Sequence, residues 1–213
     1  KSNSMDDPIE GQTNPDAAAD AIHGGECLLR AVLAEGCDYV FGIPGGEFIT
    51  FLEAVDRREH EVGDIHYIGV RHEQAGANMA DAYSRVSGKI GICTGTIGPG
   101  FANLVPGVAP AFFDNIPILV VHPQMHPKFE EHHRLQDGIN QMAVLQPIVK
   151  FQKSITDPNR IIWGAQKAFK AMRSGRPGPA QLEIREDAFH GQVVEEFGKK
   201  ALSPAQYRCV NPP

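Results

Sequence analysis

The sequence has little positive charge, no long hydrophobic run and few cysteines, and each shortage disfavours a class of protein. Lysine plus arginine number 20 against 26 aspartate plus glutamate, so the formal net charge is −6. Such a chain is poorly suited to a polyanionic partner, which disfavours nucleic acid or an anionic membrane. No apolar run approaches the roughly 20 residues of a membrane span, and no secretory signal pattern is visible. We therefore expect a cytoplasmic protein without a membrane segment.

The four cysteines are Cys27, Cys37, Cys93 and Cys209. No two of them have the C-x-x-C spacing of a metal or redox pair. The first three fall in apolar segments, which predicts small core residues in a reducing compartment.

The length of 213 residues and the hydrophobic share of 42% fit one globular domain with polar ends. Residues 1–21 are polar and without periodicity, so we expect a flexible leader. Residues 22–190 would form the domain. Residues 191–213 turn polar and end in prolines, which predicts a linker toward a further, central domain.

Between these ends, short apolar runs alternate with helical patterns. The expected strands are residues 39–42, 65–70, 90–94, 118–121, 148–154 and 180–184. The expected helices lie around residues 28–33, 48–58 and 73–86, from about 101, at 140–145 and at 158–172. Strands that alternate with helices indicate a three-layer α/β/α fold with a mostly parallel sheet of about six strands.

Three successive strand-to-turn junctions carry unusual residues. The first is GIPGG at 42–46, the second places Glu73 at the start of a helix rich in alanine and glycine, and the third is GTIGPG at 95–100 with Asn103 just beyond. In a parallel sheet such junctions lie along one edge. The three segments are therefore candidates for a common site.

Each junction also has a simpler interpretation. Glu73 can be a helix-start carboxylate favoured by the helix dipole, or a group that holds a proton in a dry cleft. Its small neighbours Ala75, Gly76 and Ala77 favour a site where something presses against the backbone. Pro44, Gly45 and Gly46 can form a tight turn that needs positive φ, or they can leave room for a ligand.

The segment at 95–100 could cradle a phosphate or nucleotide. It has neither the Lys-Ser/Thr ending of a P-loop nor the glycine spacing of the dinucleotide fingerprint. A phosphate- or nucleotide-binding module is therefore the first alternative function for this chain.

A histidine-rich stretch follows the fourth expected strand. Its candidate metal ligands are His122, His126, Glu130, Glu131, His132 and His133. Their spacing matches no zinc pattern, so a solvated loop is the favoured interpretation.

Taken together, the motifs resemble the N-terminal, pyrimidine-binding domain of thiamine-diphosphate enzymes of the acetolactate synthase and pyruvate decarboxylase superfamily. The similarity covers about residues 24–187. Its motifs are VFGIPGG at 40–46, RHEQAG at 71–76, GPGFAN at 98–103, AFFDNIP at 111–117 and SGRPGP at 174–179, in this order. The resemblance therefore implies the thiamine-diphosphate-binding fold.

The resemblance also implies roles for individual residues. Glu73 would hydrogen-bond N1′ of the cofactor's aminopyrimidine, so that N4′ can remove the proton from thiazolium C2 before attack on a 2-oxo acid. Pro44, Gly45 and Gly46 would lie near the pyrimidine. Gly98 and Asn103 would form the adjacent wall.

Several positions depart from the family pattern or vary within it. Gln136, with Leu135, resembles a position near the active site where synthases carry an aromatic residue followed by glutamine. Glu47 stands where synthases usually have a small residue, so the substrate pocket is expected to differ. His132 and His133 are similar to a histidine pair of the decarboxylase branch.

The chain contains no Gly-Asp-Gly motif, which in this family helps to hold the diphosphate and Mg²⁺ in a separate domain. The chain alone is therefore expected to be inactive, as a fragment or as one subunit of a split enzyme. The resemblance implies a homodimer or homotetramer in which a partner protomer supplies the diphosphate-binding domain, and an exposed apolar face for that contact. FAD binding is left open, because its site would lie mainly in another domain.

The motifs resemble most the branch with acetolactate synthase-like carboligation. Simple 2-oxo acid decarboxylation, including a split-subunit decarboxylase, is the alternative. A non-catalytic domain of the same fold is the second rival, and the intact Glu73 and Pro-Gly-Gly turn disfavour it.

Overall fold

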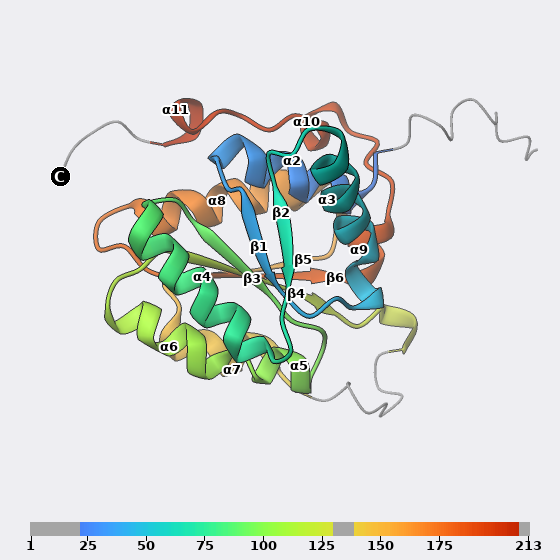
Figure 1. Cartoon of the computed structure of the whole chain (residues 1–213). Coiled ribbons are helices and arrows are strands. Elements are labelled where there is room, and N and C mark those ends of the chain that lie inside the picture. Colours follow the sequence, from blue (N-terminus) through green and yellow to red (C-terminus); the bar gives the residue numbers. More distant parts are fainter. Residues whose placement is uncertain (1–21, 130–138, 209–213) are drawn as a thin grey trace, which may run out of the picture.

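A computed structural model describes residues 22–129 and 139–208, and its centre is a six-stranded parallel sheet (Figure 1). The strand order is β2-β1-β3-β4-β6-β5. The strands are β1 Tyr39–Gly42, β2 His66–Gly69, β3 Gly91–Thr94, β4 Ile118–Gln124, β5 Phe151–Ile155 and β6 Ala180–Arg185. Every strand pair is parallel. The expected three-layer fold is confirmed.

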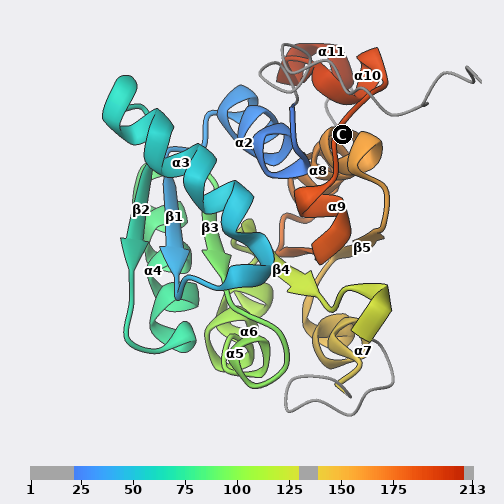
Figure 2. The ribbon, with the colours of Figure 1, turned by 90° about the vertical axis from the view of Figure 1, so that its right-hand side faces the viewer.

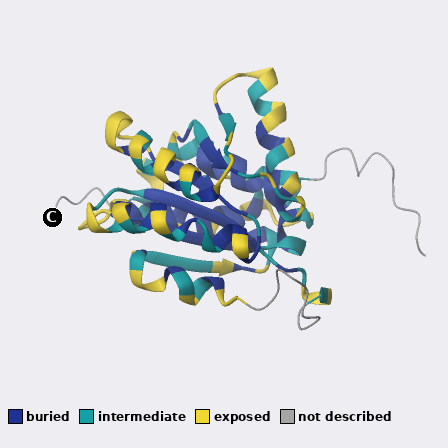
Figure 3. Cartoon of the chain, turned by 60° about the horizontal axis from the view of Figure 1, so that its bottom comes forward, coloured by how far each residue is buried: buried dark blue, intermediate teal, exposed yellow. Residues whose placement is uncertain are grey.

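The central strands read as continuous apolar runs because both faces of the sheet are covered. All residues of β3 are buried, as are all but the last residue of β4 and of β6. The edge strands β2 and β5 are mostly half-buried. Figure 3 shows this gradient, with exposed residues concentrated on the outer sides of the helices.

Two layers of helices enclose the sheet (Figures 1 and 2). On one face lie α2 Gly24–Glu35, α3 Ile49–Glu61, α8 Ile161–Arg173 and α9 Glu186–His190. On the other lie α4 Glu73–Ser87, α5 Pro99–Ala102, α6 Val105–Phe113 and α7 Gln141–Leu145. Short 3-10 turns precede or join them: η1 Gly46–Phe48, η2 Pro127–Phe129, η3 Gln146–Ile148 and η4 Pro158–Arg160.

The cysteines of the described chain belong to these cores. Cys27, Cys37 and Cys93 are buried and unpaired, and burial raises the pKa of their thiols to about 11, 12 and 12. They are therefore protonated packing residues, as expected. Cys209 lies outside the described residues.

The connections diverge between β1 and β3. The chain leaves β1 through α3 toward β2 on one side, and leaves β3 through α5 and α6 toward β4 on the other. Helix α4, which joins β2 to β3, packs against β1 as it crosses it. The arrowheads of β1, β2 and β3 point the same way in Figure 2, so the three predicted junctions share one edge. Ligands of open α/β sheets bind at such a switch point.

His122 does not lie in a loop, and that prediction is wrong. Strand β4 continues to Gln124, and His122 is fully buried within it. Of the other loop candidates, Glu130, Glu131, His132 and His133 lie outside the described residues. In residues 22–129 and 139–208, no group of three or more histidine, cysteine, aspartate or glutamate side chains could hold a metal ion.

The described part of the expected linker, residues 191–208, lies against the domain. It contains α10 Glu196–Lys199 and α11 Pro204–Tyr207. The Cys27 thiol donates to Gly198 O at 3.2 Å, and Gln166 Nε2 donates to Leu202 O at 3.0 Å. Its role as a connection to another domain stays a prediction. Within the described ranges, no helix is both long and apolar enough to cross a membrane.

Candidate functional site

Glu73 is the first residue of α4, and its carboxyl group is buried at the carboxyl edge of the sheet. His72 precedes it as the N-cap, with Nδ1 accepting from Gln74 N at 3.3 Å. Only 6% of Glu73 is exposed. A carboxylate that only stabilises the start of a helix does not need such burial. Asn103 Nδ2 donates to Glu73 Oε2 at 3.0 Å. No described residue donates to Oε1, so this oxygen can accept a hydrogen bond from a ligand.

The small residues of α4 accommodate the protein itself. A β-carbon at Gly76 would lie 3.2 Å from the carbonyl oxygen of Phe41 in β1, and one at Gly107 of α6 would lie 2.5 Å from Ala77 Cβ. At Gly76 and Ala77, the neighbour that lies close to α4 is therefore another part of the protein. Gly76 lets α4 lie close to β1, and Ala77 lets it lie close to α6.

The third junction forms a wall against Glu73. Gly98 has φ +69°, a conformation that favours glycine, and begins the turn into α5. A β-carbon at Gly100 would lie 2.9 Å from Glu73 Oε1 and 2.9 Å from Thr96 Cγ2. Glycine at position 100 thus leaves the carboxyl oxygen uncovered.

The first junction approaches the same wall. Pro44 and Gly46 are exposed, and no residue of the GIPGG segment has positive φ, so that reason for its glycines is wrong. A β-carbon at Gly45 would lie 3.1 Å from Thr96 Cβ, whereas one at Gly46 would meet no atom within 4 Å. The space beside Gly45 is therefore filled by the protein, whereas Gly46 borders open space. The alternative that a ligand lies against this turn stays a prediction.

Buried polar side chains support the Gly98 turn from behind. Gln141 Oε1 accepts from Gly98 N at 3.0 Å, and Gln141 Nε2 donates to Pro123 O at 3.0 Å. His122 Nδ1 donates to Pro123 O at 3.2 Å, so the facing Nε2 accepts from Gln181 Nε2 at 2.7 Å. The turn is thereby connected to strands β4 and β6.

Ionisation in this network follows from its burial. Burial lowers the pKa of His122 to about 3, so the imidazole is neutral near pH 7, in agreement with the single ring proton that its hydrogen bonds require. Burial also raises the pKa of Glu183, whose Oε2 lies 3.4 Å from Gln141 Nε2. These side chains are supports of the site. The sequence shows His122, Gln181 and Glu183 only as polar residues within apolar strands, and Gln141, in α7, has no comparable signal.

The structure thus brings Glu73, Asn103, Gly98, Gly45 and the neighbouring Thr96 to one edge. Pro44 and Gly46 belong to the same turn. Gln136 lies outside the described residues. Thr96 belongs to the third junction, GTIGPG at 95–100, but sequence reasoning gave it no role of its own.

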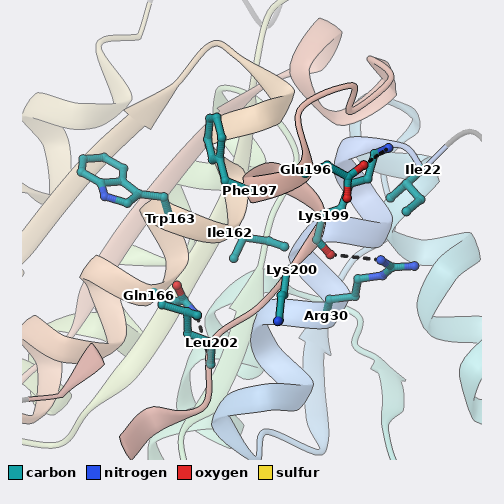
Figure 4. Close-up of a pocket in the computed structure, with 10 residues that line it drawn as sticks. All are labelled: Ile22, Arg30, Ile162, Trp163, Gln166, Glu196, Phe197, Lys199, Lys200 and Leu202. Carbon is teal, nitrogen blue, oxygen red and sulfur yellow. Dashed lines mark hydrogen bonds and ion pairs between the residues drawn. The ribbon is translucent and has the colours of Figure 1, made fainter. Parts of the chain in front are cut away.

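A separate cavity of about 760 Å³ lies between α2, α8 and α10 (Figure 4). Its lining includes Arg30, Ile162, Trp163, Phe197 and Lys199. None of the three junctions contributes to it, so it is not part of the site around Glu73.

The fold and the edge site define a class: an α/β domain with a buried glutamate facing glycine-rich turns at the switch point of a parallel sheet. The sequence matches the family model described as thiamine pyrophosphate enzyme, N-terminal TPP binding domain, over residues 22–144. The chain therefore belongs to this family, as the resemblance predicted. Glu73, Gly98 and Asn103 all fall inside the matched region.

Curated relatives agree with this assignment. The chain is 38% identical over 188 residues to the acetolactate synthase large subunit of Parasynechococcus marenigrum, covering 88% of this chain and 29% of that protein. It is 35% identical over 177 residues to the probable acetolactate synthase large subunit of Methanocaldococcus jannaschii, covering 83% and 29%. It is 35% identical over 166 residues to the acetolactate synthase large subunit of Buchnera aphidicola, covering 78% of this chain and 28% of that protein. The chain spans less than a third of the length of these relatives.

Proposed function

We propose that this chain binds the pyrimidine half of thiamine diphosphate and supplies Glu73 as proton relay in an enzyme that acts on 2-oxo acids by acetolactate synthase-like carboligation. The observation that carries the proposal is the buried Glu73 carboxyl, with Oε2 held by Asn103 and Oε1 open beside Gly100. An open acceptor oxygen in a dry site fits a ring nitrogen that carries a proton. The names of the relatives support the reaction class.

When bound, the cofactor supplies a carbon acid whose anion adds to a carbonyl group. The chain's contribution is positioning and proton transfer. Glu73 Oε1 would hold a proton between itself and pyrimidine N1′, while the Asn103 amide keeps the carboxyl group in one orientation. Gly46, which borders open space, and Gly100, where a side chain would contact Glu73 Oε1, would leave room for a flat ring.

Mg²⁺ and the diphosphate would be held by a domain that carries the Gly-Asp-Gly motif, which this sequence does not contain. We infer that this domain belongs to a partner protomer, so that the active enzyme is a homodimer or homotetramer and this chain alone is inactive. Three expectations stay predictions: a cytoplasmic location, a linker role for residues 191–213 and a contribution of Gln136. FAD binding stays open.

A phosphate or nucleotide site at residues 95–100 is disfavoured by its surroundings. Helix α5 has only four residues, and Gly100 faces the Glu73 carboxyl group. A carboxylate in that position repels a phosphate. Decarboxylation of a 2-oxo acid is the alternative within the family, and its product, an aldehyde in place of a ligated ketone, distinguishes it.

The test uses the longest natural form of the polypeptide. Calorimetric titration with thiamine diphosphate and Mg²⁺ should show binding, and pyruvate turnover should follow. Glu73→Gln should remove turnover, whereas Glu53→Gln, on the exposed side of α3, should leave both unchanged. Absence of cofactor binding by the natural form would contradict the assignment, as would full turnover in Glu73→Gln.

A further inference from the structure

The cavity between α2, α8 and α10 has an aromatic wall that the proposed function does not use. Its volume of about 760 Å³ is within the range of about 300–1,000 Å³ that is typical of binding pockets. Trp163 and Phe197 line it and are 45% and 50% exposed. In Figure 4 these two rings lie on one side of the cavity, and Ile22 and Arg30 lie on the other. Exposed apolar surface around a hollow indicates a contact that covers it.

The surroundings of this cavity are positively charged in a protein of net negative charge. The Nζ atoms of Lys153 and Lys167 each lie 5.4 Å from the centre of the Trp163 ring, and Lys200 lines the cavity directly. None of these three lysines forms an ion pair with a residue in the described ranges. The acidic residue of the lining, Glu196, is already in an ion pair. The uncompensated charge therefore favours an occupant that carries carboxylates.

An acidic segment of the same chain is attached at the edge of this cavity. Ile22, which lines the cavity, directly follows residues 1–21. Those residues contain five aspartates and glutamates and one lysine, and their only large apolar side chains are Met5 and Ile9. Three of the five carboxylates lie in the same stretch, which reads MDDPIE at 5–10. This stretch thus combines the apolar and acidic groups that the cavity would accept.

We propose that residues 5–10 bind in the cavity between α2, α8 and α10, with their two large apolar side chains against the aromatic wall and their carboxylates toward the three unpaired lysines. This inference does not depend on the cofactor. Residues 11–21 would form the tether, in keeping with the flexible leader expected from the sequence.

The attachment makes a weak attraction sufficient. A flexible tether of about 12 residues has an average end-to-end distance of about 20 Å, enough to place residues 5–10 in the cavity. A segment held by such a tether has an effective concentration in the millimolar range. A sequence that binds as a free peptide with a Kd of about 1 mM would therefore occupy the cavity in about half of the molecules.

The first test is zero-length cross-linking by a carbodiimide in the longest natural form of the polypeptide, read by mass spectrometry. The reagent joins a carboxylate to an amine only where the two are in contact. We expect links from residues 5–10 to Lys153, Lys167 or Lys200, and none to Lys128, which is exposed in η2. Absence of links to the three cavity lysines would overturn the proposal. Links only between isotopically labelled and unlabelled copies would also overturn it, because a second copy would then fill the cavity.

The second test uses the 213-residue chain, in which Trp163 is the only tryptophan and its fluorescence reports on this cavity alone. At low salt, acrylamide quenching should rise by about 1.5-fold or more in Asp6→Asn/Asp7→Asn and in Ile9→Ser, because the docked fraction is lost. Asp16→Asn/Asp20→Asn removes the same charge from the tether and is the matched control, which should behave as the parent does.

Changes on the cavity side complete the second test. Lys200→Glu should raise the quenching of Trp163, whereas Lys128→Glu should leave it unchanged. Circular dichroism verifies that each variant is folded. Equal quenching in the parent, Asp6→Asn/Asp7→Asn and Ile9→Ser would overturn the proposal, as would equal effects of the two aspartate pairs.

Discussion

Asn103, which contacts Glu73 in the fold, determines which carboxyl oxygen of Glu73 can accept a hydrogen bond from a ligand. Asn103 donates to Oε2 at 3.0 Å and so leaves Oε1 as the acceptor that faces Gly100. A hydrogen bond to a charged group contributes about 1.5–3 kcal/mol. We therefore expect Asn103→Ala to lower kcat of the natural enzyme by about tenfold or more.

Asn103→Asp is the sharper version of this prediction, because it places a second carboxylate in contact with Glu73. It should lower both thiamine-diphosphate affinity and kcat more than Asn103→Ala does, measured by calorimetry and steady-state kinetics. The aspartate variant has nearly the shape of the parent, so a loss in it reports on charge. An Asn103→Asp enzyme with the parent rate would show that Asn103 does not act on Glu73.

Glycine at position 100 is the second residue on which the geometry depends. Gly100→Ala would place a β-carbon 2.9 Å from Glu73 Oε1, so the carboxyl group must move or lose its open side. Activity should fall by at least about tenfold. The free energy of unfolding should change by about 1–3 kcal/mol, as measured by urea denaturation.

The matched control is Gly69→Ala at the end of β2, where a β-carbon would meet no atom within 4 Å. That variant should keep its activity and stay within about 0.5 kcal/mol of the parent. Equal activity in Gly100→Ala and Gly69→Ala would mean that the wall around Oε1 is not needed for function.

At the level of elements, apolar runs bounded by turn residues were sufficient to predict the sheet. The expected strand 39–42 coincides with β1, and 180–184 falls one residue short of β6. Strand β4 was predicted too short because His122 and Pro123 look like loop residues locally. The partner that makes His122 compatible with burial, Gln181, is 59 residues away in the sequence, and such distant pairing is not visible in a local pattern.

The same limit applies to the site. Glu73 and the glycines of the junctions could be proposed from their places after strands, and the family match places them in the expected domain. Gln141, which holds the Gly98 turn from 43 residues away, could not. Glu47 stood out in the sequence only as a departure from the family pattern, and its unpartnered oxygen became visible only through the fold.

Strand β4 provides a prediction for stability against pH. Burial lowers the pKa of His122 from 6.5 to about 3, so between these values the unfolded chain binds a proton that the folded chain does not. Stability should therefore fall as pH falls from 6.5 toward about 3, with a slope near 1.4 kcal/mol per pH unit from this residue.

The measurement is urea denaturation of the parent and of His122→Gln at pH 7, 6 and 5, a range in which most carboxylates are still ionised. The difference in unfolding free energy between the two proteins should shift against the parent as pH falls. The raised pKa of Glu183 acts in the opposite direction, because its contribution is lost as pH rises through that pKa. A pH-independent difference would contradict the burial of a neutral His122.

At the scale of the whole molecule, residues 191–208 join the first and last thirds of the domain. Asn159 lies in η4 and is nearly buried, and its Oδ1 accepts from Val194 N at 3.1 Å and from Glu195 N at 2.9 Å. Val193 beside them is part of the core. The segment then passes Gly198, close to the Cys27 thiol, and reaches Tyr207, which bonds Glu35 at the end of α2. A segment held at successive points should open as one unit.

Asn159→Ala tests this arrangement, because it leaves two backbone N–H groups without an acceptor and removes the attachment nearest to the domain. We expect a loss of about 2–3 kcal/mol in unfolding free energy, together with faster hydrogen exchange at Val194, Glu195 and Gly198. Ser203→Ala, which alters only the exposed cap of α11 in the same segment, should leave exchange at those amides unchanged. Equal exchange in both variants would show that the contacts with α2 and α8 hold the segment without Asn159.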